Sequence, residues 1–282
     1  MRADRTIPCF LINLNRSTAR LEHMRRVLGG AGIAFERYEA VEADRVHEHP
    51  LYSRIPKLRS PRDWARAEVA CLLSHYGAWT RIVAGDEPFG AVFEDDLHID
   101  SRMREVLVAS CMPPDADLVK LETVNTPVGI ARRQHRGPSG LHFARLYTLH
   151  HGGGAYILSR AAAQRAIESI DLFDLPVDDV LFSPKHPVGR TMRCYQVVPA
   201  VAMQDVILPV DQRSPALSSV VEPSRVASKL GMPVPEVEPA ARNRLLPLHN
   251  LPFRMVRSLW RRTIWRIETI PFRPQNGAGP KP

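Results

Sequence analysis

A short apolar run that ends in three consecutive carboxylates constrains this chain more than any other stretch. The run covers residues 90–93, and the acids that follow it are Glu94, Asp95 and Asp96. Apolar runs of this length are typical of buried strands. Three adjacent carboxylates repel one another, so burying them costs free energy unless a positive charge lies among them. The sequence therefore predicts a buried strand that ends in a charged site.

A divalent cation is one way to neutralise these acids, because Mg²⁺ and Mn²⁺ prefer carboxylate oxygens. Alternation along a strand places Glu94 and Asp96 on one face of the sheet. At the carboxyl end of a strand they would lie where open α/β sheets bind ligands. One of these acids could bind Mn²⁺ or Mg²⁺ while the other orients a sugar or base hydroxyl. The alternative is a solvated acidic turn that binds no ion.

The order of the expected elements indicates an α/β fold. A strand over residues 7–14, a helix over residues 18–28 and a strand over residues 33–41 form a βαβ opening. Such an opening is typical of a parallel sheet. A long helix over residues 64–84 precedes the acidic strand, and a strand over residues 155–158 leads into a later helix.

Charge and proline divide the chain into three parts. Residues 1–208 are assigned to one large domain, and residues 209–252, with eight prolines, to an extended connector. Residues 253–282 carry +6 of the net charge of +8 and are assigned to a basic amphipathic helix and tail. Such helices bind anionic membrane surfaces, so residues 253–272 would hold the protein on the inner face of the cytoplasmic membrane. The alternative is a helix that packs on the domain.

Composition limits the other classes of function. The first 252 residues carry a net charge of only +2, which argues against a broad nucleic-acid-binding face. The four cysteines are scattered without a C-x-x-C pair, as expected of reduced thiols in a cytoplasmic protein. The chain lacks a G-x-S-x-G elbow, a Walker A loop, an H-E-x-x-H helix and a strand-preceded G-x-G-x-x-G. These absences argue against α/β-hydrolases, P-loop enzymes, zincins and dehydrogenases.

The helix over residues 64–84 carries polar side chains on its apolar face. Glu68, His75 and Trp79 fall on one helical stripe. A buried polar group needs a hydrogen-bond partner, since an unsatisfied one costs about 1–3 kcal/mol. Glu68 and His75 therefore either contact a ligand or are satisfied within the core, and the sequence leaves both interpretations open.

A second pair of acids, Asp178 and Asp179, follows Pro176 at the start of a short helix or turn. Acids at a helix N-terminus stabilise the helix, and this is the structural interpretation. The functional interpretation is a general base that takes a proton from an acceptor hydroxyl. Residues 152–154 are three glycines that would let a ligand approach the backbone closely, just before Tyr156.

Taken together, these segments resemble one known family. Their order and spacing over residues 6–206 are similar to those of glycosyltransferase family 25. That family comprises lipopolysaccharide and lipooligosaccharide glycosyltransferases and also includes collagen galactosyltransferases. The segment before Ala155 is richer in glycine than the family pattern. The matching stretches are residues 12–16 with Arg20, 35–41, 67–76 with Trp79, 93–96, 154–160 and 176–179.

The resemblance implies a GT-A-like Rossmann-type mixed sheet flanked by helices. It also implies a nucleotide-sugar donor, a metal ion such as Mn²⁺, and inversion at the anomeric carbon. By the same resemblance Glu94 and Asp96 match the acidic metal motif, and Asp178 or, preferably, Asp179 would be the catalytic base. The residues expected at the donor are Asn13, Arg16, Glu68, His75, Glu94, Asp95, Gly154 and Tyr156.

The resemblance further indicates UDP-galactose as the donor and a cell-surface glycan, such as lipopolysaccharide or lipooligosaccharide, as the acceptor. Two other functions stay open at this point. One is a nucleotidyl- or phosphotransferase that uses the same acids on a nucleotide. The other is a membrane-associated carbohydrate-binding protein without turnover, although a pure binder has no need of two clusters of acids.

Overall fold

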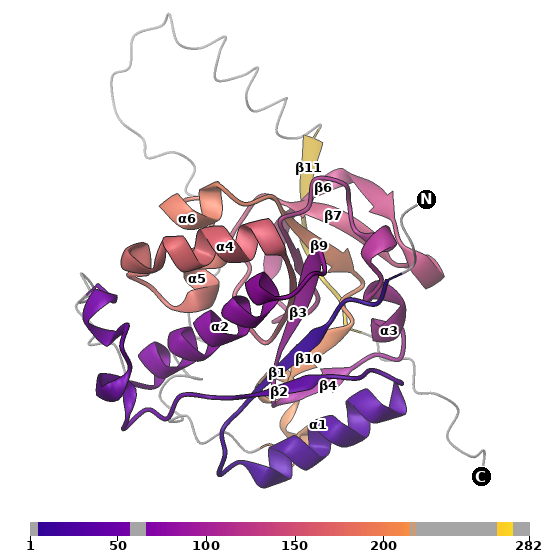
Figure 1. Ribbon diagram of the computed structural model, residues 1–282. Coiled ribbons are helices and arrows are strands. Elements are labelled where there is room, and N and C mark those ends of the chain that lie inside the picture. The colour runs from indigo at the N-terminus through magenta and orange to yellow at the C-terminus, as the bar shows by residue number, and fades with distance from the viewer. Residues whose placement is uncertain (1–4, 57–65, 215–216, 218–263, 273–282) are drawn as a thin grey trace, which may run out of the picture.

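A nine-stranded mixed sheet lies at the centre of the structure (Figure 1). The computed structural model describes residues 5–56, 66–214, 217 and 264–272. Its strands lie in the order β11-β6-β7-β9-β5-β8-β3-β1-β2. The predicted α/β fold, with a mixed sheet flanked by helices, is confirmed. The strands are β1 (Cys9–Asn13), β2 (Glu36–Glu39), β3 (Phe89–Glu94), β5 (Leu118–Lys120), β6 (Pro127–Arg136), β7 (His142–Leu146), β8 (Ala155–Ser159), β9 (Cys194–Val198) and β11 (Trp265–Thr269).

Parallel pairing brings the ends of β1 and β3 to one edge of the sheet. Strand β1 pairs in parallel with both β2 and β3, so the predicted βαβ opening is confirmed. Ile12 lies opposite Glu94 in the register, and Asn13 is the last residue of β1. Asp95 and Asp96 then form the turn from β3 into β4 (Leu97–Ile99), which pairs with β10 (Ala202–Gln204) in a small second sheet.

Helices cover both faces of the large sheet (Figure 1). Helices α2 (Arg66–Ala84), α4 (Arg160–Glu168) and α5 (Val177–Leu181) pack on one face, and α1 (Thr18–Gly30) and α3 (Met103–Val106) on the other. Strand residues alternate between the two apolar cores. Val92 and Tyr156 belong to the core beneath α2, whereas Phe93 and Ile157 belong to the opposite core. This alternation is the period-two geometry of a strand that is buried on both faces.

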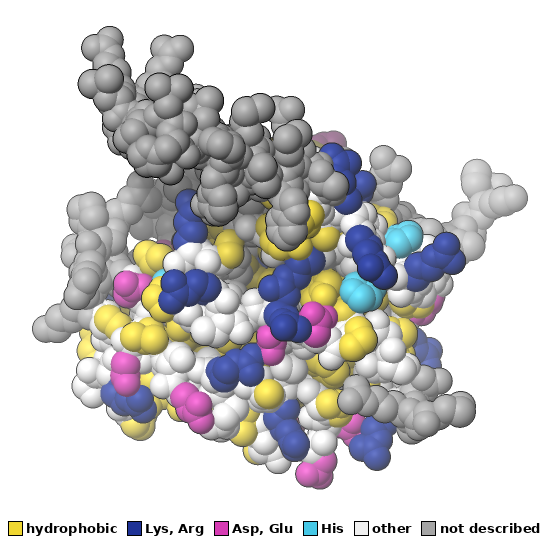
Figure 2. Space-filling model, turned by 90° about the horizontal axis from the view of Figure 1, so that it is seen from above, with side chains coloured by type: hydrophobic (Ala, Val, Ile, Leu, Met, Phe, Trp, Pro, Cys, Tyr) yellow, Lys and Arg dark blue, Asp and Glu magenta, His cyan; other side chains and the backbone are white. Residues whose placement is uncertain are grey.

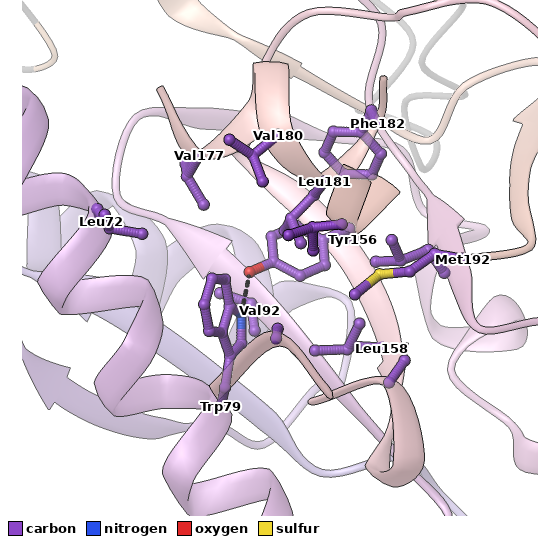
Figure 3. Packing of buried hydrophobic residues seen from close by; sticks show 14 of the residues in the cluster. Leu72, Trp79, Val92, Tyr156, Leu158, Val177, Val180, Leu181, Phe182 and Met192 are labelled. Atoms are coloured by element: carbon purple, nitrogen blue, oxygen red, sulfur yellow. Dashed lines mark hydrogen bonds between the residues drawn. The ribbon is translucent and has the colours of Figure 1, made fainter. Parts of the chain in front are cut away.

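Trp79 joins α2 to the sheet (Figure 3). The side chain is fully buried, and its ring lies 5.6 Å from that of Phe173. Its indole Nε1 donates a hydrogen bond to the Tyr156 hydroxyl at 2.7 Å. Polar atoms inside an apolar core are tolerated when they are paired in this way.

The predicted C-terminal amphipathic helix is wrong over Trp265–Thr269, which form strand β11. β11 pairs antiparallel with β6, and Trp265 covers Gly129, where a Cβ would collide with the indole ring. Aromatic and β-branched residues favour a strand wherever a sheet edge offers unpaired backbone groups. Ile270 directly follows β11 and is fully buried in the core beneath α2.

The remaining predictions for residues 209–282 fall mostly on segments outside the described part of the chain. Residues 253–263 and most of the connector over residues 209–252 lie outside the described part of the chain, so the predicted domain boundaries stay predictions. Among the described residues, no helix has the length and apolar character needed to cross a bilayer. On the face shown in Figure 2, basic and acidic side chains are interspersed with apolar ones.

We predict that Gly189→Ala will destabilise the fold by about 1–3 kcal/mol, because an added methyl group in a packed region forces the backbone to shift. Gly189 lies in α6 (Pro187–Arg190), and a Cβ there would come within 2.5 Å of the Val180 carbonyl oxygen of α5. Urea denaturation gives the free energy of unfolding. Gly29→Ala is the matched control, because nothing lies within 4 Å of a Cβ at that position in α1. Equal midpoints for the two variants would contradict the packing described here.

Candidate active site

The Asp95 carboxylate is held between the ends of β1 and β3. Asn13 Nδ2 donates to Oδ2 at 2.7 Å, and Arg20 donates to Oδ1 at 2.7 Å. Asp95 is buried, and burial raises the pKa of its carboxyl while Arg20 opposes the shift. Asn13 Oδ1 in turn accepts a hydrogen bond from Arg37 at 2.9 Å. Asn13 therefore orients an acid of the site and is itself fixed by an arginine.

Asp96, like Glu122, has one carboxylate oxygen without a hydrogen-bond partner among the described residues. Its Oδ1 is buried without a hydrogen-bond partner among the described residues, and its Oδ2 lies 3.9 Å from Arg20. Burial and the neighbouring Glu94 raise the pKa of Asp96 to about 8. A partly exposed carboxylate with one buried, unsatisfied oxygen beside other acids fits a hard divalent cation, which prefers oxygen ligands.

Glu94 is held through both of its carboxylate oxygens. Its Oε1 lies 3.2 Å from His75 Nε2 and 3.7 Å from Cys71 Sγ, both on α2. Its Oε2 accepts a hydrogen bond from Gln204 Nε2 at 2.8 Å, at the end of β10. The Glu94 side chain is 24% exposed, so it lies at the boundary between the core and solvent. Helix α2 and strand β10 together fix the orientation of the Glu94 carboxylate.

A buried ion pair supports the strand end beside Glu94. Glu122 Oε1 lies 3.1 Å from Lys120 Nζ, and both side chains are fully buried. The same oxygen accepts a hydrogen bond from Gly154 N at 2.6 Å, and the Gly154 carbonyl accepts from Glu94 N at 2.8 Å. Burial raises the pKa of Glu122, and Lys120 opposes the shift. A Cβ on Gly154 would lie 2.7 Å from Gln204 Nε2, so a larger residue here would displace the Gln204 side chain that holds Glu94.

The second pair of acids is tied to the glycine segment. Asp178 is buried, and its Oδ2 accepts a hydrogen bond from Gly152 N at 2.7 Å. Gly152 has a φ of +91°, a left-handed conformation that favours glycine. Asp179 Oδ1 lies 2.8 Å from His151 Nδ1, and the Asp179 side chain is 27% exposed. Of the two acids, Asp179 is the more accessible to a substrate.

The other predicted donor residues lie at different depths. His75 and Tyr156 are fully buried, and they connect to the acids through Glu94. Glu68 is partly exposed in the first turn of α2, two turns before His75. The Arg16 side chain is 53% exposed and forms an ion pair with Glu42.

Four residues at the acids were not predicted as site residues. Arg20 appeared only in a matching segment, although among the described arginines it is the one that lies beside both Asp95 and Asp96. Lys120 and Glu122 alternate along the end of a short apolar strand, a pattern that could have identified them. Gln204 lies 110 residues from Glu94 in the chain, and nothing in its local sequence marks it.

Comparison with known proteins decides the family. The sequence model described as "Glycosyltransferase family 25 (LPS biosynthesis protein)" matches residues 6–181. The chain belongs to glycosyltransferase family 25. The predicted resemblance is therefore confirmed, and the chain is a glycosyltransferase, an enzyme class that requires a sugar donor and a glycan or other acceptor.

Three similar proteins illustrate the range of the family. The lacto-N-neotetraose biosynthesis glycosyltransferase LgtB of Neisseria gonorrhoeae is 28% identical over 233 residues, which cover 76% of this chain and 81% of that protein. The lipooligosaccharide biosynthesis protein lic2B of Haemophilus influenzae is 22% identical and covers 94% of this chain and 98% of its own length. Human procollagen galactosyltransferase 2 is 26% identical over 66% of this chain, but the match covers only 32% of that longer protein.

We predict that, in EDTA, Asp96→Asn will raise the free energy of unfolding by about 1 kcal/mol or more at about pH 8 and by less at about pH 5. The folded carboxyl keeps its proton up to about pH 8, whereas the unfolded one loses it near 3.8. Between these values unfolding releases a proton, so the stability of the unsubstituted protein falls as pH rises. Asparagine carries no charge and removes this slope.

Urea denaturation across this pH range measures the effect. Asp171→Asn is the control, because Asp171 is exposed and its hydrogen bond with Arg54 lowers the pKa of its carboxyl. The Asp171 carboxyl does not titrate between about pH 5 and pH 8 in the folded or the unfolded protein. Its substitution should therefore leave the change of unfolding free energy with pH unaltered. A slope in Asp96→Asn equal to that of the unsubstituted protein would contradict the assignment.

Proposed function

We propose that this glycosyltransferase transfers galactose from UDP-galactose to a cell-surface glycan such as lipopolysaccharide or lipooligosaccharide. The observation that carries the proposal is the Asp96 carboxylate, whose Oδ1 is buried without a hydrogen-bond partner among the described residues, beside Glu94 and Asp95 at the carboxyl ends of two parallel strands. In open α/β sheets this is the edge at which ligands bind. Two relatives support the sugar and the acceptor, since one is named a galactosyltransferase and another a lipooligosaccharide biosynthesis protein.

Asp96 and Glu94 are the residues that would hold Mn²⁺ or Mg²⁺. When bound, such an ion neutralises the charge that develops on a departing diphosphate. Arg20 already contributes one positive charge beside Asp95 and Asp96. Asn13 fixes Asp95 through its amide, which keeps the acidic turn in place as the donor enters. These contacts orient the acids before any substrate binds.

The proposed reaction is a single displacement with inversion. Asp179 takes the proton of an acceptor hydroxyl, and the hydroxyl oxygen forms a bond to the anomeric carbon of the donor sugar. The bond between that carbon and the diphosphate oxygen breaks, and the nucleoside diphosphate leaves on the opposite face. His151 Nδ1 holds one oxygen of Asp179 at 2.8 Å, which leaves the carboxylate oriented toward a substrate. Asp178 supports the neighbouring Gly152 backbone instead.

A membrane location also belongs to this proposal. Arg254, Arg257, Arg261 and Arg262 form a basic segment that precedes β11. A basic segment of this kind is attracted to anionic lipid headgroups, and a lipid-linked acceptor would be found at the same surface. We infer a peripheral position on the inner face of the cytoplasmic membrane.

Incubation with a panel of nucleotide sugars and Mn²⁺ tests the activity. We expect release of UDP from UDP-galactose in the presence of a lipooligosaccharide acceptor, and loss of that release in Asp96→Ala and in EDTA. Removal of a general base typically lowers the rate by about 10²–10⁴-fold, so Asp179→Asn should fall in that range.

Asp171→Ala serves as the control, since Asp171 is exposed and pairs with Arg54 away from the acids described above. Circular dichroism must show that each variant is folded. Full activity in Asp96→Ala would refute the metal assignment. Transfer of the nucleotidyl or phosphoryl group, in place of the sugar, would refute the reaction type.

Flotation with anionic vesicles tests the membrane proposal. Replacing Arg254, Arg257, Arg261 and Arg262 with glutamine should weaken binding by at least about tenfold, because each arginine near an anionic surface contributes about 1 kcal/mol. The substitution leaves β11 intact, unlike a truncation. A charge-matched control replaces four exposed arginines of the described surface, namely Arg25, Arg26, Arg133 and Arg136. Equal losses in the two variants would show that net charge alone determines binding.

A further inference from the structure

Three hydrogen bonds connect the apolar core to an acid of the candidate active site. Trp79 Nε1 lies 2.7 Å from the Tyr156 hydroxyl, which lies 2.9 Å from His75 Nδ1. His75 Nε2 then lies 3.2 Å from Glu94 Oε1. Trp79, His75 and Tyr156 are fully buried, whereas Glu94 is partly exposed. Figure 3 shows the first of these bonds, enclosed by apolar side chains.

The direction of each hydrogen bond follows from the chemistry of its donor. An indole N–H can only donate, so the Tyr156 oxygen accepts from Trp79. Burial raises the pKa of Tyr156 well above its ordinary value, so the phenol keeps its hydrogen. Among the described residues, His75 Nδ1 is the acceptor that this hydrogen reaches. If Nδ1 accepts, the neutral imidazole carries its proton on Nε2 and donates it to Glu94.

We propose that Trp79, Tyr156 and His75 form a positioning relay that holds Glu94 in one orientation, with His75 fixed as the neutral tautomer protonated on Nε2. The relay starts at Trp79, which is packed between α2 and the sheet. Its hydrogen bonds therefore tie the orientation of Glu94 to well-packed residues of the core. Because Gln204 holds the other oxygen of Glu94, the carboxylate cannot rotate without breaking a hydrogen bond at each end.

The same hydrogen bonds argue against one competing role for His75. Cys71, His75 and Glu94 place a sulfur, a nitrogen and an oxygen within 4.8 Å of one another, as in some metal sites. A metal ion on His75 Nε2 would need that nitrogen unprotonated. The relay places a hydrogen there, directed at Glu94. His75 is therefore assigned as a positioning residue, and the proposed cation stays assigned to Asp96 and Glu94.

The tautomer can be measured without any activity. In protein labelled with ¹⁵N-histidine, long-range ¹H–¹⁵N spectra distinguish the two neutral tautomers and the imidazolium, and His75→Gln identifies the His75 signals. We expect the Nε2-protonated neutral form in the unsubstituted protein. Tyr156→Phe, which removes only the hydroxyl, should abolish the single fixed tautomer. A tautomer protonated on Nδ1, an imidazolium, or an unchanged spectrum in Tyr156→Phe would overturn the relay.

Kinetics test whether the relay acts through Glu94, a step that rests on the proposed sugar transfer. Loss of a residue that orients a ligand-binding side chain typically costs 10- to 100-fold, so kcat/KM for the nucleotide sugar in Tyr156→Phe should fall by about that factor. The KM for the acceptor should not change. In a Glu94→Gln background the same substitution should have almost no further effect, because coupled residues are not additive.

Tyr195→Phe is the matched control, because it removes a phenol that donates to Asp115 at 2.7 Å on another part of the sheet. Additive effects of Tyr156→Phe and Glu94→Gln, or equal losses in Tyr156→Phe and Tyr195→Phe, would show that Tyr156 has only a structural role and would overturn the relay.

Failure of the relay and failure of the proposed function can be distinguished. If no nucleotide sugar reacts with the unsubstituted protein, the proposed function fails while the spectra still decide the tautomer.

Discussion

The rest of the site depends on a single guanidinium group placed among three carboxylates. Arg20 lies 2.7 Å from Asp95 and 3.9 Å from Asp96, and Glu94 takes its partners from other elements. Burial raises the pKa of Asp96 to about 8, and the neighbouring Glu94 adds to the shift while Arg20 opposes it. A cation that binds Asp96 at neutral pH would therefore displace its proton. Functional sites often retain a local conflict of this kind, which the surrounding fold must offset.

The backbone of residues 152–154 connects the two acidic clusters and helps to hold both in place. Gly154 bonds to Glu122 through its N–H and to Glu94 through its carbonyl, while Gly152 N–H bonds to Asp178. One short segment thus fixes the strand end that carries the first cluster and the helix start that carries the second. The glycines are needed because the space around them is already filled by Glu122 and Gln204. The distance between the proposed donor acids and the proposed base is set by main chain rather than by mobile side chains.

The sequence predicted the elements whose signal is local. Strand β3 and helix α2 were predicted from apolar periodicity, and the structure confirms them. The predicted C-terminal helix is wrong over Trp265–Thr269 because the pairing of β11 with β6 joins residues more than a hundred positions apart, and such pairing outweighs an amphipathic pattern. Gln204 could not have been placed at Glu94 for the same reason. The packing around the glycine segment was not predicted, because close packing depends on neighbours that a local pattern does not reveal. The contact of Gly154 with the donor stays a prediction.

The two interpretations that the sequence left open for His75 turn out not to exclude each other. A polar chain inside a core is stable when each member is satisfied, so Trp79, Tyr156 and His75 qualify as structural residues. A purely structural network, however, would end on a buried partner. This one ends on Glu94, which is 24% exposed and bonded on its other oxygen by a residue of a separate sheet. Here the last hydrogen of the network is directed at a partly exposed acid, so the buried residues orient a side chain of the site. This distinguishes a positioning role from one that only satisfies buried polar groups.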